Sequence, residues 1–242
     1  MKKIGFIGFG NMAEAIITGM ISSGNFESNE IGAFDTDMNK LKSGADKLGI
    51  TAFESNEELV SQCSCIVLAV KPITLQKVLT PLIDLLRKVN PLVISIAAGQ
   101  SIERLKNYME FDAKIIRVMP NINAIAGEAV SGYAFSDNVT EDDILTSIRI
   151  LESFGTAVPV DEDEFSVYSA IAGCSPAYSY LFIDAVARVG VKYGLSKKDA
   201  LEIVTTAVIN KSNDFDLNNG SEFEKIVFNA IEASYKKDKG MQ

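Results

Sequence analysis

Near its N-terminus the chain reads Ile4-Gly-Phe-Ile-Gly-Phe-Gly-Asn-Met-Ala-Glu14, a short apolar run followed directly by a glycine-rich turn. The run at 4–7 predicts a strand, and the turn at 8–13 has the G-x-G-x-x-G/A form that opens a helix in dinucleotide-binding folds. Gly8 permits the tight turn, and Gly10 lets the backbone approach a pyrophosphate. The stretch therefore predicts a dinucleotide site, with a tight turn that binds nothing as the alternative.

Outward from this turn, short β-branched runs alternate with helical stretches to about residue 160, and only helical stretches follow. Continuous apolar runs are typical of strands buried on both faces of a parallel sheet. The pattern predicts an α/β fold, an N-terminal Rossmann-type doubly wound sheet with a C-terminal all-α helical domain. We expect a dinucleotide-binding domain at 1–160 and a helical substrate and dimerisation domain at 161–242. The expected strands are 4–7, 31–34, 65–70, 92–96, 115–119, 129–135 and 156–160, and the expected helices are 12–23, 39–48, one from 56, 140–154, 165–172, 176–193, 197–217 and 222–239.

Composition excludes several classes of function. The formal charge is −9 and there is no histidine, which disfavours nucleic-acid binding and removes imidazole catalysis and His-ligated zinc. Three cysteines, Cys63, Cys65 and Cys174, are too few for a disulfide framework or a four-ligand metal site. No run reaches the length of about eighteen apolar residues that a membrane span needs. We expect a cytoplasmic protein with reduced thiols and without a metal, a nucleic-acid partner or a membrane.

The residue after the second expected strand bears on the choice of dinucleotide. Asp35 stands there, and an acidic side chain at this place accepts hydrogen bonds from the ribose 2′-hydroxyl and repels a 2′-phosphate. The cofactor prediction is NADH or NADPH, with NADH slightly favoured. The alternative is that Asp35 or Asp37 only caps the next helix.

Several motifs, taken in order, resemble those of pyrroline-5-carboxylate reductases. Residues 4–14 resemble the family's cofactor loop, and the later motifs are LAVKP at 68–72, SIAAG at 95–99, IRVMPN at 116–121, AGCSPAY at 172–178 and GVKYGL at 190–195. The resemblance covers residues 1 to about 210. It implies an enzyme that reduces 1-pyrroline-5-carboxylate to L-proline, the last step of proline biosynthesis, with hydride from NAD(P)H. It also implies a homodimer through the helical domain, or a larger ring, which agrees with helices that are apolar beyond a single stripe.

The resemblance places the site in the loops that follow the strands. The implied cofactor-binding residues are Phe6, Ile7, Gly8, Phe9, Gly10, Asn11, Met12, Asn56, Ala69, Val70, Lys71, Pro72, Ala97, Ala98 and Gly99, with Asp35 added from its position. The expected substrate-binding residues are Asn121, Gly173, Cys174 and Ser175, the last three as backbone N–H donors at a helix start before Pro176. No catalytic side chain is assigned, because a protonated imine mainly needs to be held against the nicotinamide. Purely structural turns at Lys71-Pro72, Pro120 and Pro176 are the alternatives.

The sequence departs from the family pattern in two places. Cys174 stands where the family commonly has Ser. The family also has an S-P-G-G-T-T segment that holds the substrate, whereas only residues 213–221 join the corresponding helices here. Either that half of the substrate site is absent or the sequence omits a segment. We expect a polypeptide of these 242 residues to bind NADH but hardly turn over the imine, and the natural protein to be longer between Asn213 and Ser221.

Two other functions remain open from the sequence alone. One is a hydroxyacid dehydrogenase on the same two-domain plan. Such enzymes carry a lysine early in the helix after the domain boundary, and the helix from Pro176 has none before Lys192. The other is an NAD(P)-binding protein with a lost or altered substrate site, which would bind NADH without reducing the imine.

Overall fold

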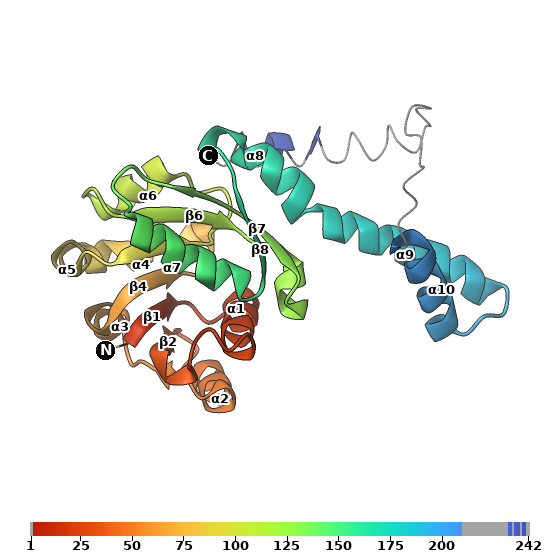
Figure 1. Cartoon of the computed structure of the whole chain (residues 1–242), viewed down its shortest axis with the longest axis horizontal. Coiled ribbons are helices and arrows are strands. Elements are labelled where there is room, and N and C mark those ends of the chain that lie inside the picture. The colour runs from red at the N-terminus through yellow and green to blue at the C-terminus, as the bar shows by residue number, and fades with distance from the viewer. Residues whose placement is uncertain (1, 210–231, 234, 238, 241–242) are drawn as a thin grey trace.

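The computed structural model describes residues 2–209, 232–233, 235–237 and 239–240. A sheet flanked by helices occupies the first two-thirds of the chain, and a helical arm extends away from it (Figure 1). The connection at 213–221 lies outside the described residues, as does most of the helix expected at 222–239.

Eight strands form one sheet in the order β3-β2-β1-β4-β5-β6-β7-β8. All neighbours are parallel except β6 and β7, which are antiparallel. The order of the first six strands is that of a dinucleotide-binding sheet, with its switch point between β1 and β4. The predicted α/β fold is therefore confirmed. The strands are β1 (Lys2–Ile7), β2 (Ile31–Phe34), β3 (Thr51–Ala52), β4 (Cys63–Leu68), β5 (Leu92–Ser95), β6 (Ile115–Met119), β7 (Ala129–Phe135) and β8 (Gly155–Pro159).

Helices cover both faces of the sheet (Figure 1). Alternate β1 side chains point to opposite faces, so Phe6 packs in the core under α1, α2 and α7, and Ile7 packs in the core under α3 to α6. The helices are α1 (Asn11–Ser22), α2 (Met38–Leu48), α3 (Asn56–Gln62), α4 (Leu75–Leu79), α5 (Ile83–Val89), α6 (Ile102–Met109), α7 (Glu141–Glu152), α8 (Phe165–Tyr168), α9 (Ser175–Lys192) and α10 (Lys197–Ile209). Short 3₁₀ turns are η1 (Ser28–Glu30), η2 (Pro72–Thr74), η3 (Thr80–Leu82), η4 (Ile122–Ala126) and η5 (Glu162–Glu164), and η6 (Ser169–Gly173) is a π turn.

Several details differ from the sequence-based expectations, and helices α4, α5 and α6 were not expected. The strand expected at 65–70 lies at 63–68, so Ala69 and Val70 belong to the loop that follows it. Strand β3 was not expected. The residues Ser55 and Glu58 have the spacing of a capping box, from which a helix start at 56 is expected, but only half of the box forms. Ser55 accepts the N–H of Glu58, whereas the Glu58 carboxylate accepts the N–H of Glu54 instead of that of Ser55.

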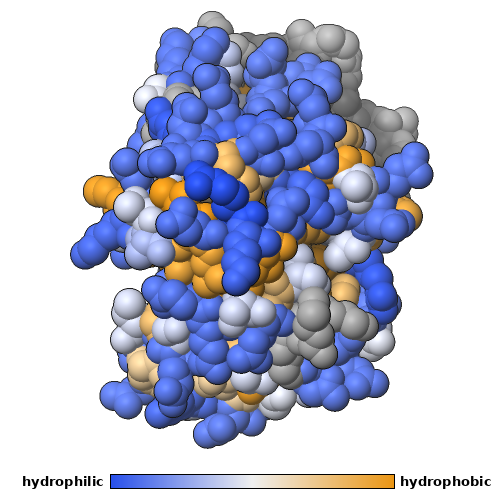
Figure 2. Space-filling model, turned by 90° about the vertical axis from the view of Figure 1, so that its left-hand side faces the viewer, coloured by the Kyte–Doolittle hydropathy of each residue, from blue (hydrophilic) through white to orange (hydrophobic). Residues whose placement is uncertain are grey.

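The helical part begins without the break that the sequence suggested at Gly173. The 3₁₀ turn η5, helix α8, the π turn η6 and α9 form one continuous helix, Glu162–Lys192, which by length and composition alone could cross a membrane. Its outer half packs against α10 through buried Ala187, Ala200 and Val204. Many other apolar side chains of the arm are exposed. By contrast, the face of the molecule in Figure 2 is mostly hydrophilic, with hydrophobic residues showing between the polar ones.

Candidate active site

The glycine-rich turn joins the end of β1 to the start of α1. Gly8 has φ +100°, and a Cβ added there would lie 2.8 Å from the carbonyl oxygen of Ala69. Gly10 has an extended backbone, and an added Cβ would meet no atom within 4 Å. No side chain caps the first N–H groups of α1. Within the turn, the N–H groups of Gly8 and Phe9 donate to Phe34 and Asp35, so the uncapped start of α1 and the open space at Gly10 are the features that suit a pyrophosphate.

A cavity of about 340 Å³ lies at the carboxyl ends of β1, β2 and β4. It brings together five of the predicted cofactor residues: Ile7, Gly8, Asp35, Asn56 and Val70. The Oδ1 atom of Asn56 is buried and has no hydrogen-bond partner among the described residues. Such an acceptor calls for a donor from a ligand or an ordered water, which suits the hydroxyls and amino group of an adenosine.

Sequence reasoning missed the far wall of this cavity. That wall is formed by side chains of η2, α4 and η3, which no motif singles out. The lining residues that were not predicted are Phe34, Thr36, Thr74, Lys77, Val78 and Pro81. Lys77 is the positively charged residue among those that line the cavity, and it is exposed to solvent.

Asp35 and Asp37 have separate tasks. Asp37 caps α2 by accepting the N–H of Lys40 at 3.0 Å. Asp35 accepts the N–H of Phe9 at 2.7 Å with one carboxylate oxygen and the N–H of Asp37 at 2.9 Å with the other. The capping alternative therefore holds for Asp37, whereas Asp35 ties the glycine turn to the end of β2 and lines the cavity.

Several predicted cofactor residues can reach a ligand only through their backbone. The side chains of Phe6 and Phe9 are fully buried, and the Phe9 ring occupies the space that a Cβ on Gly44 would need. Asn11 is exposed and Met12 is half-buried in the first turn of α1. The buried Phe9 ring thus anchors the glycine turn to the core, against α2.

The other predicted cofactor loops follow β4 and β5 along the same edge of the sheet. Lys71 is exposed and precedes η2, whose first residue is Pro72. After β5, Ala97 is buried, Ala98 is half-buried and Gly99 has φ +68°. Sequence reasoning missed Gln100, whose Oε1 atom is buried without a hydrogen-bond partner among the described residues.

At the end of β6 the sheet meets the helical arm. The buried side chain of Asn121 donates through Nδ2 to the carbonyl oxygen of Ala172 at 3.2 Å. A Cβ on Gly173 would lie 3.1 Å from the terminal methyl of Met119. The structure therefore brings Asn121 and Gly173 to one place, next along the edge from the loop after β5.

One expectation about this region is met only in part. Helix α9 begins at Ser175 with Pro176 in its first turn, as expected. The π turn η6 leads straight into it, however, and the N–H of Cys174, which was expected to be free, donates to the carbonyl oxygen of Ser169 at 3.2 Å. The physical reason is the π turn, which carries helical hydrogen bonding through the glycine where an α-helix would have ended.

In the part of the chain that the structure describes, three side chains have clearly shifted pKa values, Cys65, Asp143 and Tyr168, and all three lie outside the lining of this cavity. Burial raises the pKa of Cys65, and it raises that of Tyr168 to about 12. Burial alone would raise the pKa of Asp143, but hydrogen bonds with Thr140 and Lys114 hold it below its ordinary value. Among the described residues no cluster of three carboxylates or thiols could hold a metal.

Comparison with known proteins gives matches over both parts of the chain. The family described as "NADP oxidoreductase coenzyme F420-dependent" matches residues 3–99, and "Pyrroline-5-carboxylate reductase dimerisation" matches residues 162–214. The pyrroline-5-carboxylate reductase of Methanosarcina acetivorans is 36% identical over 208 residues, which are 86% of this chain and 77% of that protein. The Escherichia coli enzyme is 35% identical over 211 residues, 87% of this chain and 78% of that protein.

A solved structure agrees over nearly the whole length. The Plasmodium falciparum pyrroline carboxylate reductase with NADP bound superimposes with a TM-score of 0.87 at 29% identity, covering 99% of this chain and 97% of that one. The sheet order and the glycine turn are those of a dinucleotide-binding fold, and the matching proteins place the chain among the nicotinamide-dependent oxidoreductases. Because it is 36% and 35% identical to these two reductases over 77% and 78% of their lengths, the chain belongs to the pyrroline-5-carboxylate reductase family.

Proposed function

We propose that this chain reduces 1-pyrroline-5-carboxylate to L-proline with hydride from NAD(P)H, the last step of proline biosynthesis, in the cytoplasm. The observation that carries the proposal is the 36% identity to a named reductase over 208 residues. When bound, the reduced nicotinamide supplies a hydride to the imine carbon, and the nitrogen keeps the proton that it already carries.

In this proposal the chain divides into a cofactor part at 1–160 and a substrate and dimerisation part at 161–242. The backbone of the glycine turn and the start of α1 bind the pyrophosphate, while Asp35 and Asn56 face the adenosine. The loops 69–72 and 97–99 hold the nicotinamide at the edge of the sheet. The turn at 173–175 borders the substrate. The protein's contribution is orientation, which is the main demand when the imine is already electrophilic.

The direct test follows the absorbance of reduced nicotinamide. Its loss is expected only when the imine is added, with proline as the product. Oxidation or reduction of 2-hydroxy acids without activity on the imine would replace the proposal with the hydroxyacid dehydrogenase alternative. If the protein binds NADH but reduces neither substrate, the alternative of an NAD(P)-binding protein with a lost or altered substrate site is favoured.

We expect NADH to bind about tenfold more tightly than NADPH, because the Asp35 carboxylate would face the negatively charged 2′-phosphate. Fluorescence titration of both cofactors measures the ratio. Asp35→Ser should narrow it, whereas Asp37→Ser removes the same charge nearby, keeps a helix cap and should leave the ratio unchanged. Tighter binding of NADPH by the wild-type protein would mean that Asp35 only ties the turn to β2.

We also expect a homodimer formed through the arm, with a larger ring as a further assembly. Leu181, Val189 and Ile203 are 70%, 56% and 56% exposed, and Val189 and Ile203 line an apolar groove of about 530 Å³ between α9 and α10. A monomer seldom leaves such a surface in water. Sedimentation should give a dimer for the wild-type protein and a monomer for Val189→Asp. Leu145→Asp, a matched change at an exposed site on α7, should stay dimeric. A monomeric wild-type protein at micromolar concentration would contradict this.

A further inference from the structure

A proline inside the long helix leaves one carbonyl without its normal partner. In an α-helix each N–H donates to the carbonyl four residues earlier, and proline has no N–H. Pro176 is the second residue of α9 and lies within the continuous helix Glu162–Lys192. In the α-helical register of α9, the carbonyl that loses its donor is that of Ala172, in the π turn Ser169–Gly173. The N–H of Ala177, which would be its donor in a π register, donates to the carbonyl oxygen of Cys174 at 3.1 Å instead.

The missing donor comes from the sheet. Asn121, just past the end of β6, donates through Nδ2 to this same carbonyl oxygen of Ala172 at 3.2 Å. Its Oδ1 atom accepts the N–H groups of Asn123 at 3.2 Å and Val130 at 3.3 Å. Two N–H donors at Oδ1 fix which end of the carboxamide is the oxygen, so the amino end must face Ala172. Asn121 is 6% exposed, which makes an unpaired group here costly.

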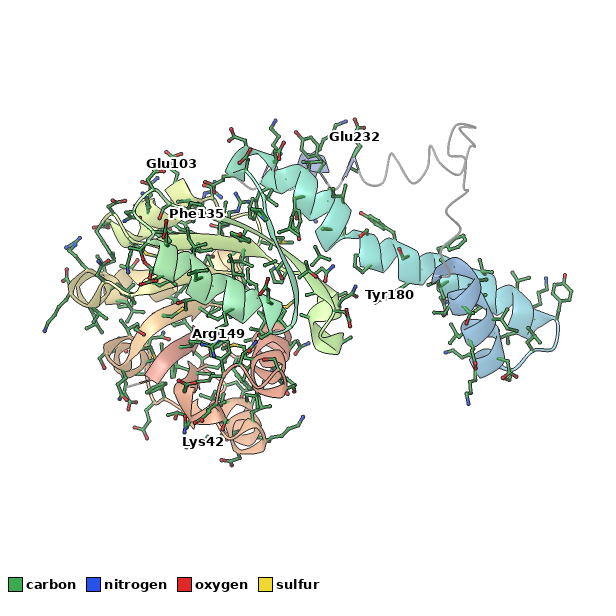
Figure 3. The ribbon with its side chains drawn as sticks, viewed as in Figure 1. Lys42, Glu103, Phe135, Arg149, Tyr180 and Glu232 are labelled. Atoms are coloured by element: carbon green, nitrogen blue, oxygen red, sulfur yellow. The ribbon has the colours of Figure 1, made fainter. Side chains whose placement is uncertain are left out.

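We propose that Asn121 is a positioning residue that replaces the absent N–H of Pro176 and so fixes the π turn against the end of β6. The inference rests on the proposed function, because the turn carries Gly173 and Cys174 to the substrate side of the site. The three hydrogen bonds of the Asn121 carboxamide described above are all to the protein's own backbone. Its effect on the imine therefore passes through the place and direction of α9, which leaves the sheet at this point (Figure 3).

A second contact from the same loop supports this reading of the geometry. The hydroxyl of Tyr180, which lies one turn beyond Pro176 on α9, donates to Oδ1 of Asn123 at 2.8 Å. Tyr180 is labelled in Figure 3 where the arm departs from the sheet. It is 56% exposed, so this bond is the weaker of the two. The loop after β6 thus holds the helix at two places about two turns apart, and the bond to Ala172 is the buried one.

The decisive variant is Asn121→Asp. It keeps acceptors for the N–H groups of Asn123 and Val130 but turns a carboxylate oxygen toward the carbonyl of Ala172. The KM for the imine is expected to rise about tenfold, with a fall in kcat, while the Kd for NADH stays within about twofold. Cys174 gives a readout that needs no activity, since it is half-buried while Cys63 and Cys65 are buried. Its rate of modification by a thiol reagent should rise several-fold.

Two further variants separate positioning from loss of stability. Asn138 makes the same kind of bond near the other end of β6, with Nδ2 donating to the carbonyl of Asp112 at 2.8 Å. Asn138→Asp should change neither the KM for the imine nor the reactivity of Cys174. Pro176→Ala restores the missing N–H, so adding Asn121→Asp to that variant should raise the KM by less than about threefold.

The proposal is overturned if Asn121→Asp leaves the Cys174 rate and the KM at wild-type values. It is equally overturned if Asn138→Asp has the same effect, or if the full effect of Asn121→Asp persists beside Pro176→Ala. A wild-type protein that fails to reduce the imine would refute the proposed function instead. The thiol modification rates would still test the positioning of the turn in that case.

Discussion

Gly10→Asp is expected to weaken NADH binding by about a hundredfold or more without harming the fold. The backbone at Gly10, φ −83° and ψ 179°, is one that any residue adopts, and no atom lies within 4 Å of an added Cβ. The space in front of Gly10 is therefore open, as it must be if a ligand's phosphates lie there. A carboxylate placed there would both fill it and repel the pyrophosphate. As the residue preceding α1, Asp should even stabilise the helix by a few tenths of a kcal/mol relative to Gly.

The measurements are a fluorescence titration with NADH and a thermal unfolding curve. Gly8→Ala gives the contrast, since Gly8 has φ +100° and an added Cβ would lie 2.8 Å from the Ala69 carbonyl oxygen. That variant should lose about 1–3 kcal/mol of stability. If Gly10→Asp binds NADH as well as the wild-type protein does, the phosphates do not lie at this turn.

A polypeptide of these 242 residues is expected to reduce the imine about a hundred to ten thousand times less efficiently than a chain that contains the family's S-P-G-G-T-T segment. The connection at 213–221 reads Asn-Asp-Phe-Asp-Leu-Asn-Asn-Gly-Ser, which is polar and turn-forming and offers little to enclose a substrate. Each charge-assisted hydrogen bond that the segment would make is worth about 1.5–3 kcal/mol. Losing two of them accounts for the expected range.

The comparison is between the kcat/KM of this chain and that of a variant with S-P-G-G-T-T inserted between Asn213 and Ser221. An insertion of glycine and serine of the same length is the control. Both variants should bind NADH equally, because the cofactor loops lie within residues 6–99. An intact mass measurement on the natural protein decides whether the chain is longer there. Full activity from a polypeptide of 26.2 kDa would contradict the prediction.

Much of the fold was predictable because the strands are continuous apolar runs. The expected strands at 31–34, 115–119 and 129–135 coincide with β2, β6 and β7. Strand β3, two residues long, is too short to carry a periodic signal. The antiparallel direction of β7 was not predicted, although only residues 120–128 join it to β6. Parallel neighbours need a crossover of a dozen or more residues, so this short connection was itself a usable signal.

Only part of the candidate site, too, could be predicted from the sequence. Gly8, Asp35 and Asn56 were predictable because each stands at the end of a strand or the start of a helix. At these places the residue type alone indicates a turn, a cap or a ligand contact. Lys77 on α4 was not, because no spacing relates it to the glycine turn. The bond from Asn121 to the carbonyl of Ala172 joins residues 51 positions apart, and only the folded chain brings them together.

The central claim is that this protein transfers hydride from a reduced nicotinamide to the imine carbon of pyrroline-5-carboxylate. The most direct test incubates the protein with the imine and NADH that carries deuterium at both C4 positions of the nicotinamide, followed by mass spectrometry of the proline formed. The label reports the chemistry however slow the turnover is. We predict proline with one deuterium on the former imine carbon, in proportion to the cofactor oxidised. Bound NADH with no labelled proline above a protein-free control would contradict the claim.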